Sequence, residues 1–231
     1  MTVGVVQAMA EDLPSGRPEG AGRLITFEGG EGAGKSTQMR RLGARLRALG
    51  FAVVETREPG GTAVAEAIRT FILSGRAKAL GAAGEAILFA AARADHVDRV
   101  VSPALERGDI VLCDRFIDST RAYQGADGVD AALIDKLEAF AIGAARPHLT
   151  LILDLPVEKG LARAAARRGA DGADRFERET IAQHEARRHI FLAIAAREAE
   201  RCVVIDADRG ADDVAAEIWQ SVAARLPSAA R

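Results

Sequence analysis

The residues of this chain best suited to chemistry lie in the glycine-rich string GGEGAGKST. Its spacing fits a phosphate-binding loop, in which glycines let consecutive backbone N–H groups face a phosphate, a lysine supplies a cation and a serine hydroxyl reaches Mg²⁺. Lys35 is therefore a candidate catalytic residue, and Ser36 is a candidate metal ligand. The candidates for nucleotide binding are Gly29, Gly30, Glu31, Gly32, Ala33, Gly34, Lys35, Ser36 and Thr37.

The sequence on either side of this loop predicts a strand before it and a helix after it. Leu24 to Phe27 reads as a buried strand. Met39, Leu42, Leu46 and Leu49 recur at helical spacing and form one apolar stripe. The context is that of a loop that holds nucleotide phosphates, rather than a glycine-rich turn without a ligand.

The overall composition predicts one compact soluble domain with no polyanionic partner. The chain has 231 residues, of which 48% are hydrophobic, and a formal charge of −2. The arginines are scattered among acidic residues instead of forming a basic block, so nucleic-acid binding has no electrostatic signature.

The two cysteines and the apolar runs predict the compartment. Cys113 and Cys202 each lie in an apolar, strand-like run, which suits buried thiols better than a disulfide and favours a reducing cytoplasm. No apolar run approaches the roughly 20 residues of a membrane span, and the N-terminus lacks the pattern of a signal peptide. We therefore expect neither a secreted nor a membrane protein.

Further along the chain, strand-like and helical patterns alternate. Residues 1–22 are rich in proline and glycine and are predicted to be a flexible extension, followed by a single domain over residues 23–231. The pattern predicts an α/β fold of the P-loop NTPase type, in three layers, with a five-stranded parallel sheet covered by helices on both faces. The predicted strands are Leu24–Phe27, Ala52–Thr56, Ile110–Cys113, Leu149–Leu155 and Cys202–Ile205.

Two arginines directly follow strands, where ligands bind in sheets of this class. Arg57 follows the second predicted strand, and Arg115 lies just beyond the third. Both are candidates to grip a second phosphate through a forked pair of hydrogen bonds. Each could instead form an ordinary ion pair, with Glu58 or Asp114 respectively.

A kinase for a phosphorylated acceptor differs from other proteins with a phosphate-binding loop in that it must bind a second anionic substrate. A switch GTPase is expected to carry an Asn-Lys-x-Asp motif for reading the base, and the chain has none. A motor or helicase usually needs a longer chain. The strand-end arginines therefore favour a kinase that phosphorylates a phosphate-bearing acceptor.

Several ordered strings show that the chain, over about residues 22–225, resembles the bacterial thymidylate kinases. Besides the loop, they are TREPGGT at Thr56–Thr62, LFAAAR at Leu88–Arg93, CDRF at Cys113–Phe116, STRAYQG at Ser119–Gly125 and DRFE at Asp174–Glu177. The resemblance implies transfer of the γ-phosphoryl group of ATP to deoxythymidine monophosphate (dTMP), with Mg²⁺, in a cytoplasmic homodimer.

The resemblance also implies roles for individual residues in binding dTMP. Glu31 would bind the 3′-hydroxyl of the sugar, and Arg57 with Arg115 would bind the phosphate. Phe89 would stack on thymine, although an apolar residue in an alanine-rich helix is also a natural core residue. The remaining implied contacts are Arg93, Thr120 and Gln124 with the base, and Tyr123 beside the sugar.

In the resemblance, a lid over residues 163–176 supplies the catalytic arginines that this loop lacks. The usual Arg-x-Arg-Gly pattern is replaced here by Ala-Arg-Arg-Gly at 166–169. We favour Arg168 and Arg175 as catalytic, together with Arg115 and Lys35. Asp114 has two possible roles, as an outer partner of Mg²⁺ or as a residue that orients Arg115.

Two alternatives remain open on the sequence. One is another nucleoside monophosphate kinase, such as a guanylate or cytidylate kinase, which would differ in the base pocket. The other is a nucleotide-switched module that hydrolyses ATP slowly and needs no acceptor.

Overall fold

The structure is a computed structural model that describes residues 22–168, 176 and 179–226. Within these residues, five strands form one all-parallel sheet with the order β2-β3-β1-β4-β5. No strand end differs from its predicted position by more than one residue. The strands are β1 (Arg23–Glu28), β2 (Val53–Arg57), β3 (Ile110–Asp114), β4 (Leu149–Asp154) and β5 (Cys202–Asp206).

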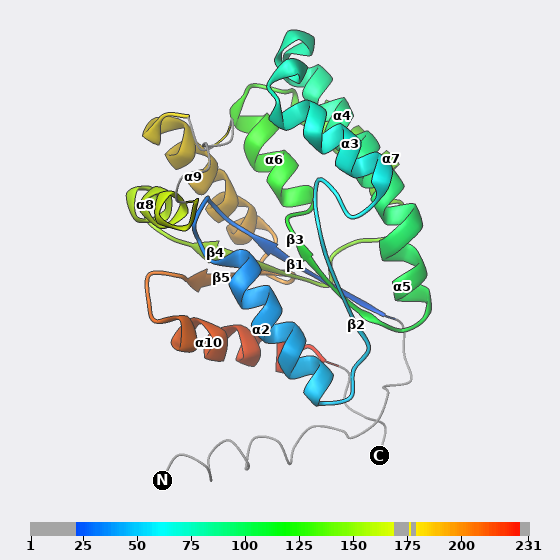
Figure 1. Cartoon of the computed structure of the whole chain (residues 1–231), viewed down its shortest axis with the longest axis vertical. Coiled ribbons are helices and arrows are strands. Elements are labelled where there is room, and N and C mark those ends of the chain that lie inside the picture. Colours follow the sequence, from blue (N-terminus) through cyan, green and yellow to red (C-terminus); the bar gives the residue numbers. More distant parts are fainter. Residues whose placement is uncertain (1–21, 169–175, 177–178, 227–231) are drawn as a thin grey trace.

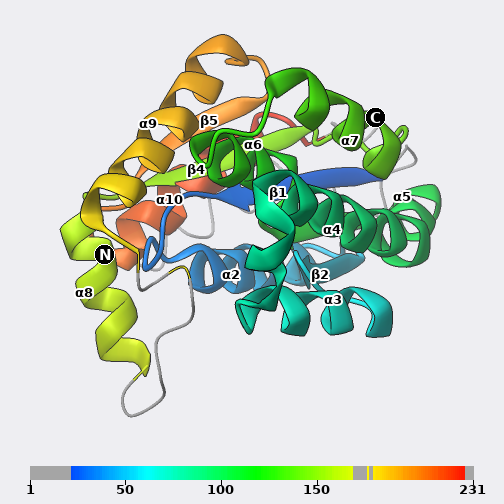
Figure 2. The ribbon, with the colours of Figure 1, turned by 90° about the horizontal axis from the view of Figure 1, so that it is seen from above.

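Helices cover both faces of this sheet, which confirms the predicted fold (Figures 1 and 2). One face packs against α2 (Lys35–Ala48) and α10 (Ala211–Ala223). The opposite face packs against α4 (Gly81–His96), α5 (Ser102–Glu106), α6 (Ile117–Ala126), α7 (Ala131–Ile142) and α9 (Ile181–Arg197). The other helices are α3 (Ala63–Leu73), a 3₁₀ turn at Arg76–Leu80, a π-helical turn at Val97–Val101 and α8 (Val157–Arg168).

Two apolar clusters hold these layers together. Phe27 and Leu46 belong to the cluster between the sheet, α2 and α10. Leu24 and Phe116 belong to the cluster on the other face. Because side chains alternate between the two faces of a strand, β1 contributes to both clusters and is buried on both sides.

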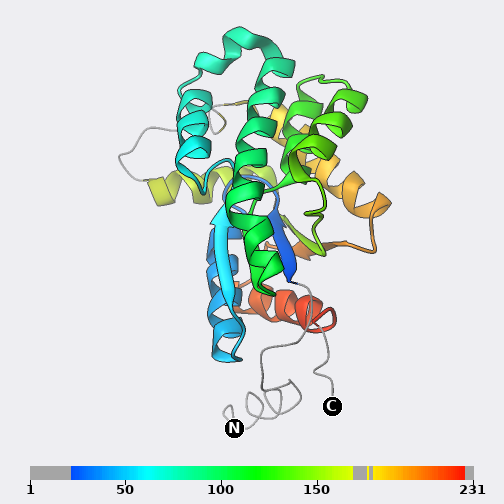
Figure 3. The same cartoon turned by 90° about the vertical axis from the view of Figure 1, so that its right-hand side faces the viewer.

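All five strands end in a charged residue at the carboxyl edge of the sheet. These residues are Glu28, Arg57, Asp114, Asp154 and Asp206. In Figure 3, β1 (blue) and β2 (cyan) run upward, and α3 with the start of α4 lies above their ends. The carboxyl edge of the sheet therefore carries charged side chains and is covered by α3 and the start of α4.

The thiols of Cys113 and Cys202 are free and buried, as predicted. Burial raises the pKa of Cys113 well above its ordinary value and that of Cys202 to about 11. Among the helices that the structure describes, none is long and apolar enough to cross a bilayer.

Candidate active site

The phosphate loop joins the end of β1 to the start of α2. Gly32 and Gly34 have φ angles of +67° and +94°, in the left-handed region that favours glycine. Gly34 is the N-cap of α2 and offers no side-chain cap to the first N–H groups of the helix. The N–H of Thr37 donates to the carbonyl oxygen of Gly34 (3.1 Å), but those of Lys35 and Ser36 can bind an anion, and the helix dipole favours one at this position.

The loop also packs tightly against helix α8. A Cβ atom at Gly32 would collide with the carbonyl oxygen of Gly160, and one at Gly160 would collide with the carbonyl oxygen of Glu31. Glycine at both positions therefore lets the backbone of the loop approach the helix.

Lys35 lies inside the loop, with only 7% of its surface exposed. Its Nζ donates to the carbonyl oxygens of Gly29 (3.0 Å) and Gly30 (2.8 Å). Burial and the nearby Arg115 cation lower the pKa of Lys35 to about 8, against the opposing effect of Glu31. The negative charge of a bound phosphate would stabilise the charged form of the amine.

Ser36 and Asp114 meet at the mouth of the loop. Ser36 Oγ donates to Asp114 Oδ2 at 2.5 Å. A hydroxyl and a carboxylate are oxygen donors of the kind that Mg²⁺ prefers, and this ion usually keeps several waters. The described residues contain no cluster of three or more His, Cys, Asp or Glu side chains that could hold a metal ion, so Mg²⁺ would need additional water or phosphate oxygens here.

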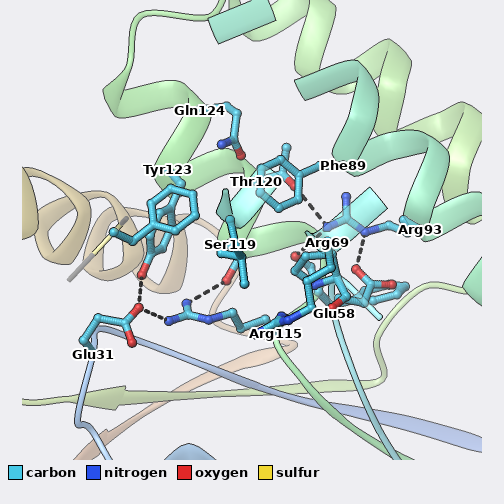
Figure 4. Close-up of a pocket in the computed structure, with 14 residues that line it drawn as sticks. Glu31, Glu58, Arg69, Phe89, Arg93, Arg115, Ser119, Thr120, Tyr123 and Gln124 are labelled. Carbon is cyan, nitrogen blue, oxygen red and sulfur yellow. Dashed lines mark hydrogen bonds and ion pairs between the residues drawn. The ribbon is translucent and has the colours of Figure 1, made fainter. Parts of the chain in front are cut away.

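A pocket opens between this loop and helices α3, α4 and α6 (Figure 4). It holds about 650 Å³ of empty space when the open solvent at its mouth is included. We call it the Phe89 pocket. Its lining includes the predicted residues Glu31, Phe89, Arg93, Arg115, Thr120, Tyr123 and Gln124, together with Arg69, Ser119 and Phe176, among others.

Glu31 is the centre of the polar end of this pocket. Its Oε1 accepts hydrogen bonds from Arg115 Nη2 (2.6 Å) and from the Tyr123 hydroxyl (3.0 Å), as Figure 4 shows. Burial alone would raise the pKa of Glu31, but Arg115, Lys35 and Tyr123 together lower it to about 2. Glu31 is therefore ionised throughout the physiological range.

Arg115 reaches the pocket from an unusual backbone conformation. Its φ is +69°, and among the described residues it is the only non-glycine residue with a positive φ. Its N–H donates to the carbonyl oxygen of Phe27 (2.9 Å), and its Nη1 donates to Gly29 O and Ser119 Oγ, both at 3.2 Å. Arg115 is paired with Glu31 and not with Asp114, the partner considered from the sequence.

The opposite end of the pocket is formed by Arg93, Thr120 and Gln124. Arg93 is only 4% exposed, and it donates from Nε to Glu58 (2.6 Å) and from Nη2 to Phe116 O and Thr120 Oγ1, both at 3.0 Å. Gln124 is also buried, and its Nε2 has no hydrogen-bond partner. A buried donor without a partner is costly, so a ligand that accepts a hydrogen bond here would be favoured.

Comparison with known proteins identifies the family. The family model for thymidylate kinase matches residues 27–218. The chain belongs to the thymidylate kinase family. It is 57% identical over 212 residues to the thymidylate kinase of Rhodopseudomonas palustris, which covers 91% of this chain and 92% of the relative. It is 55% identical over 216 residues to that of Bradyrhizobium sp., which covers 93% and 96%.

A solved structure agrees with this membership. The crystal structure of thymidylate kinase from Ehrlichia chaffeensis superposes with a TM-score of 0.70 at 31% identity. The match covers 88% of this chain and 100% of that chain. The sequence resemblance to the family is thereby confirmed.

Arg57 lies apart from the other residues predicted for the acceptor. Its Nη2 forms an ion pair with Glu66 (2.7 Å), and it lines a neighbouring hollow together with Ser36 and Asp114. Arg57 therefore forms an ion pair, but its partner is Glu66 on α3 and not Glu58, the partner considered from the sequence. The assignment of Arg57 to the acceptor phosphate stays a prediction.

Two predicted lid residues cannot be placed. Arg175 lies outside the described residues, and Arg168 is the last residue of α8, with a side chain that is not described. Arg163 donates to the carbonyl oxygen of Ala207 (3.0 Å), beyond β5.

The structure adds a residue that the sequence reading missed. Arg69, on α3, lines the Phe89 pocket, and its Nη1 donates to the carbonyl oxygen of Pro59 (3.0 Å). It stands in an ordinary helical pattern, so only the packing of α3 over the carboxyl edge brings it to the site.

Proposed function

We propose that this protein transfers the γ-phosphoryl group of ATP to dTMP and so forms ADP and deoxythymidine diphosphate. The observation that carries the proposal is the Phe89 pocket, which lies directly beside a phosphate loop in a chain of the thymidylate kinase family. It combines an aromatic ring for a base with a guanidinium for a phosphate. Proteins that are 54–57% identical to this chain are thymidylate kinases.

The residues of the pocket would orient the acceptor. Arg115 binds its phosphate, and Glu31 accepts a hydrogen bond from the 3′-hydroxyl of its sugar. Phe89 stacks on thymine, while Arg93 and Gln124 donate to the base. This arrangement fixes the acceptor beside the loop, and alignment of the two substrates is the main requirement of phosphoryl transfer.

The residues of the loop would hold ATP. The backbone N–H groups before α2 bind the phosphates, and Lys35 brings a cation to the β- and γ-oxygens. Ser36 and Asp114 would hold Mg²⁺, which would supply positive charge at the phosphate oxygens. Arg168 and Arg175 would supply further positive charge around the transferred phosphoryl group. Arg57 would have to break its ion pair with Glu66 to bind a phosphate.

A coupled assay of ADP release tests the proposed reaction. The nucleoside monophosphates are offered one at a time with ATP and Mg²⁺. We expect the highest kcat/KM with dTMP, a lower value with deoxyuridine monophosphate, because one methyl group contributes only about 1–3 kcal/mol, and little activity with purine or cytidine acceptors. Preference for a purine acceptor would contradict the proposal, and release of phosphate without any acceptor would favour the nucleotide-switched module.

We also propose that the protein is a homodimer. Large apolar side chains on α3, α4 and α7 and at the turn before α4 are half exposed or more: Val64, Leu80, Ile87 and Phe140. These helices lie side by side (Figure 1). Burying these side chains against a second copy would remove them from water. Sedimentation equilibrium tests this, with Ile87→Asp expected to give monomers and Val204→Asp, on the distant strand β5, expected to leave the dimer intact.

A cytoplasmic location completes the proposal. The free thiols of Cys113 and Cys202 are consistent with a reducing compartment. Fractionation of cells that produce the protein tests it: recovery with the cytoplasmic fraction is expected, and recovery from the periplasm or membranes would contradict it.

A further inference from the structure

Glu28, the last residue of β1, makes contacts that none of the roles above uses. It is completely buried. Its Oε1 accepts hydrogen bonds from the backbone N–H of Phe116 (2.7 Å) and of Ser119 (3.2 Å), and its Oε2 accepts one from the Ser119 hydroxyl (2.6 Å). One carboxylate thus holds three donors at the beginning of α6.

These contacts replace a missing helix cap. The N-cap residue of α6 is Phe116, whose side chain cannot accept a hydrogen bond. In the primary sequence, Glu28 is 88 residues away from Phe116, yet the sheet brings its carboxylate to the unpaired N–H groups of the helix. A negative charge is also favourable there because of the helix dipole.

The same carboxylate reaches Arg115 through Ser119. The Ser119 hydroxyl has one hydrogen, and since this hydrogen points to Glu28, its lone pairs remain for other donors. Arg115 Nη1 donates to that oxygen at 3.2 Å. Arg115 is the residue before Phe116, whose N–H donates to Glu28. The backbone of Arg115 is in the left-handed region, which is unfavourable for a residue with a Cβ.

We propose that Glu28 is a positioning residue for the acceptor: its carboxylate fixes the start of α6 and turns the Ser119 hydroxyl so that the Arg115 guanidinium stays aimed into the Phe89 pocket. This inference rests on the proposed function, in which Arg115 binds the phosphate of dTMP. Glu28 acts through Ser119 and Arg115 and does not touch the substrate.

The surroundings of Glu28 act on its ionisation in both directions. Burial and the Asp118 carboxylate raise the pKa of Glu28 to about 7, while Ser119, Arg115 and the N–H of Phe116 act in the opposite direction. Lys35 is the other cation whose charge interacts with it. An apolar side chain at this position would avoid the cost of burying a carboxylate, but it could not accept the three hydrogen bonds that Glu28 accepts.

The experiment compares Glu28→Gln with Asp130→Asn. Gln keeps the shape of Glu28 but has one acceptor oxygen instead of two, so it cannot hold all three donors. Asp130 caps α7 through its side chain, which accepts from the N–H of Leu133, away from the pocket. Both variants lose the negative charge of a carboxylate at a helix N-terminus, but only Glu28→Gln should raise the KM for dTMP at least fivefold and lower kcat, with the KM for ATP unchanged within twofold.

A double variant separates positioning from simple loss of stability. If Glu28 acts through Ser119, then Glu28→Gln combined with Ser119→Ala should raise the KM for dTMP no more than the stronger single variant. Fold-changes that multiply, or a KM for dTMP in Glu28→Gln equal to that of the unmodified protein, would overturn the inference. If Glu28→Gln does not fold by circular dichroism, Ser119→Ala alone decides, and an unchanged KM for dTMP overturns it.

The two proposals fail in different ways. Absence of activity toward dTMP in the unmodified protein removes the proposed function and the inference together. Normal activity with an unaffected Glu28→Gln variant removes only the inference.

Discussion

Replacing Glu31 by Gln tests the polar end of the Phe89 pocket, because it removes one charge and keeps the shape. The pKa of Glu31 falls from 4.5 to about 2. A shift of that size corresponds to about 3 kcal/mol of net stabilisation of the ionised form, after the opposing effect of burial. A hydrogen bond from the 3′-hydroxyl of dTMP to the charged carboxylate is worth about 1.5–3 kcal/mol, and one to a neutral amide about 0.5–1.5 kcal/mol.

These values give a test with two substrates and two proteins. Glu31→Gln and the unmodified protein are assayed by ADP release with dTMP and with its 3′-deoxy analogue. The unmodified protein should prefer dTMP in kcat/KM by about 13- to 160-fold, and the variant by only about 2- to 13-fold. If the variant keeps the full preference of the unmodified protein, Glu31 does not bind the 3′-hydroxyl.

The same variant has a pH signature in stability. The folded-state pKa of Glu31 is depressed, so its ionisation stabilises the fold above pH 4.5, and this stabilisation is lost as the pH falls toward 2. Glu31→Gln should therefore be less stable than the unmodified protein at pH 7 in urea titrations. The difference between the two should shrink below about pH 4.5, and a difference that does not change with pH would show that charge is not its source.

Three further predictions concern other parts of the molecule. Lys35→Met should abolish ADP release while dTMP still binds by calorimetry, and loss of dTMP binding would contradict a role confined to ATP. Phe89→Ala should raise the KM for dTMP about 5- to 160-fold, since stacking of a base on an aromatic ring contributes about 1–3 kcal/mol. A change below twofold would mean that Phe89 is an ordinary core residue. Arg201 binds both oxygens of the fully buried Asp118, each at 2.8 Å. Arg121 Nη1 also lies 3.3 Å from Asp118 Oδ1. Arg201→Met should cost about 3 kcal/mol in urea unfolding, and a loss below about 1 kcal/mol would mean that Arg121 alone compensates the charge of Asp118.

The strands and the loop were predictable because their signals are local. Strands buried on both faces, such as β1 and β3, produce short continuous apolar runs. The loop carries its chemistry within nine consecutive residues, from Gly29 to Thr37. The residues that line the Phe89 pocket were predicted from the family resemblance and not from their spacing in the sequence.

What the sequence did not reveal depends on contacts between distant segments. Glu28 and Ser119 are 91 residues apart, and no periodicity links them. Arg57 ends its strand as predicted, but the packing of α3 offers it Glu66 as a partner. Arg69 enters the pocket from the same helix, where its spacing resembles that of any surface arginine.

The most direct test of the account is a crystal structure of the protein with dTMP and a non-hydrolysable ATP analogue. We predict that thymine stacks on Phe89, that the dTMP phosphate lies within hydrogen-bond distance of Arg115, and that the γ-phosphate faces it from the loop at Lys35. Finding dTMP bound outside the Phe89 pocket, or bound with its phosphate turned away from Arg115, would contradict the account.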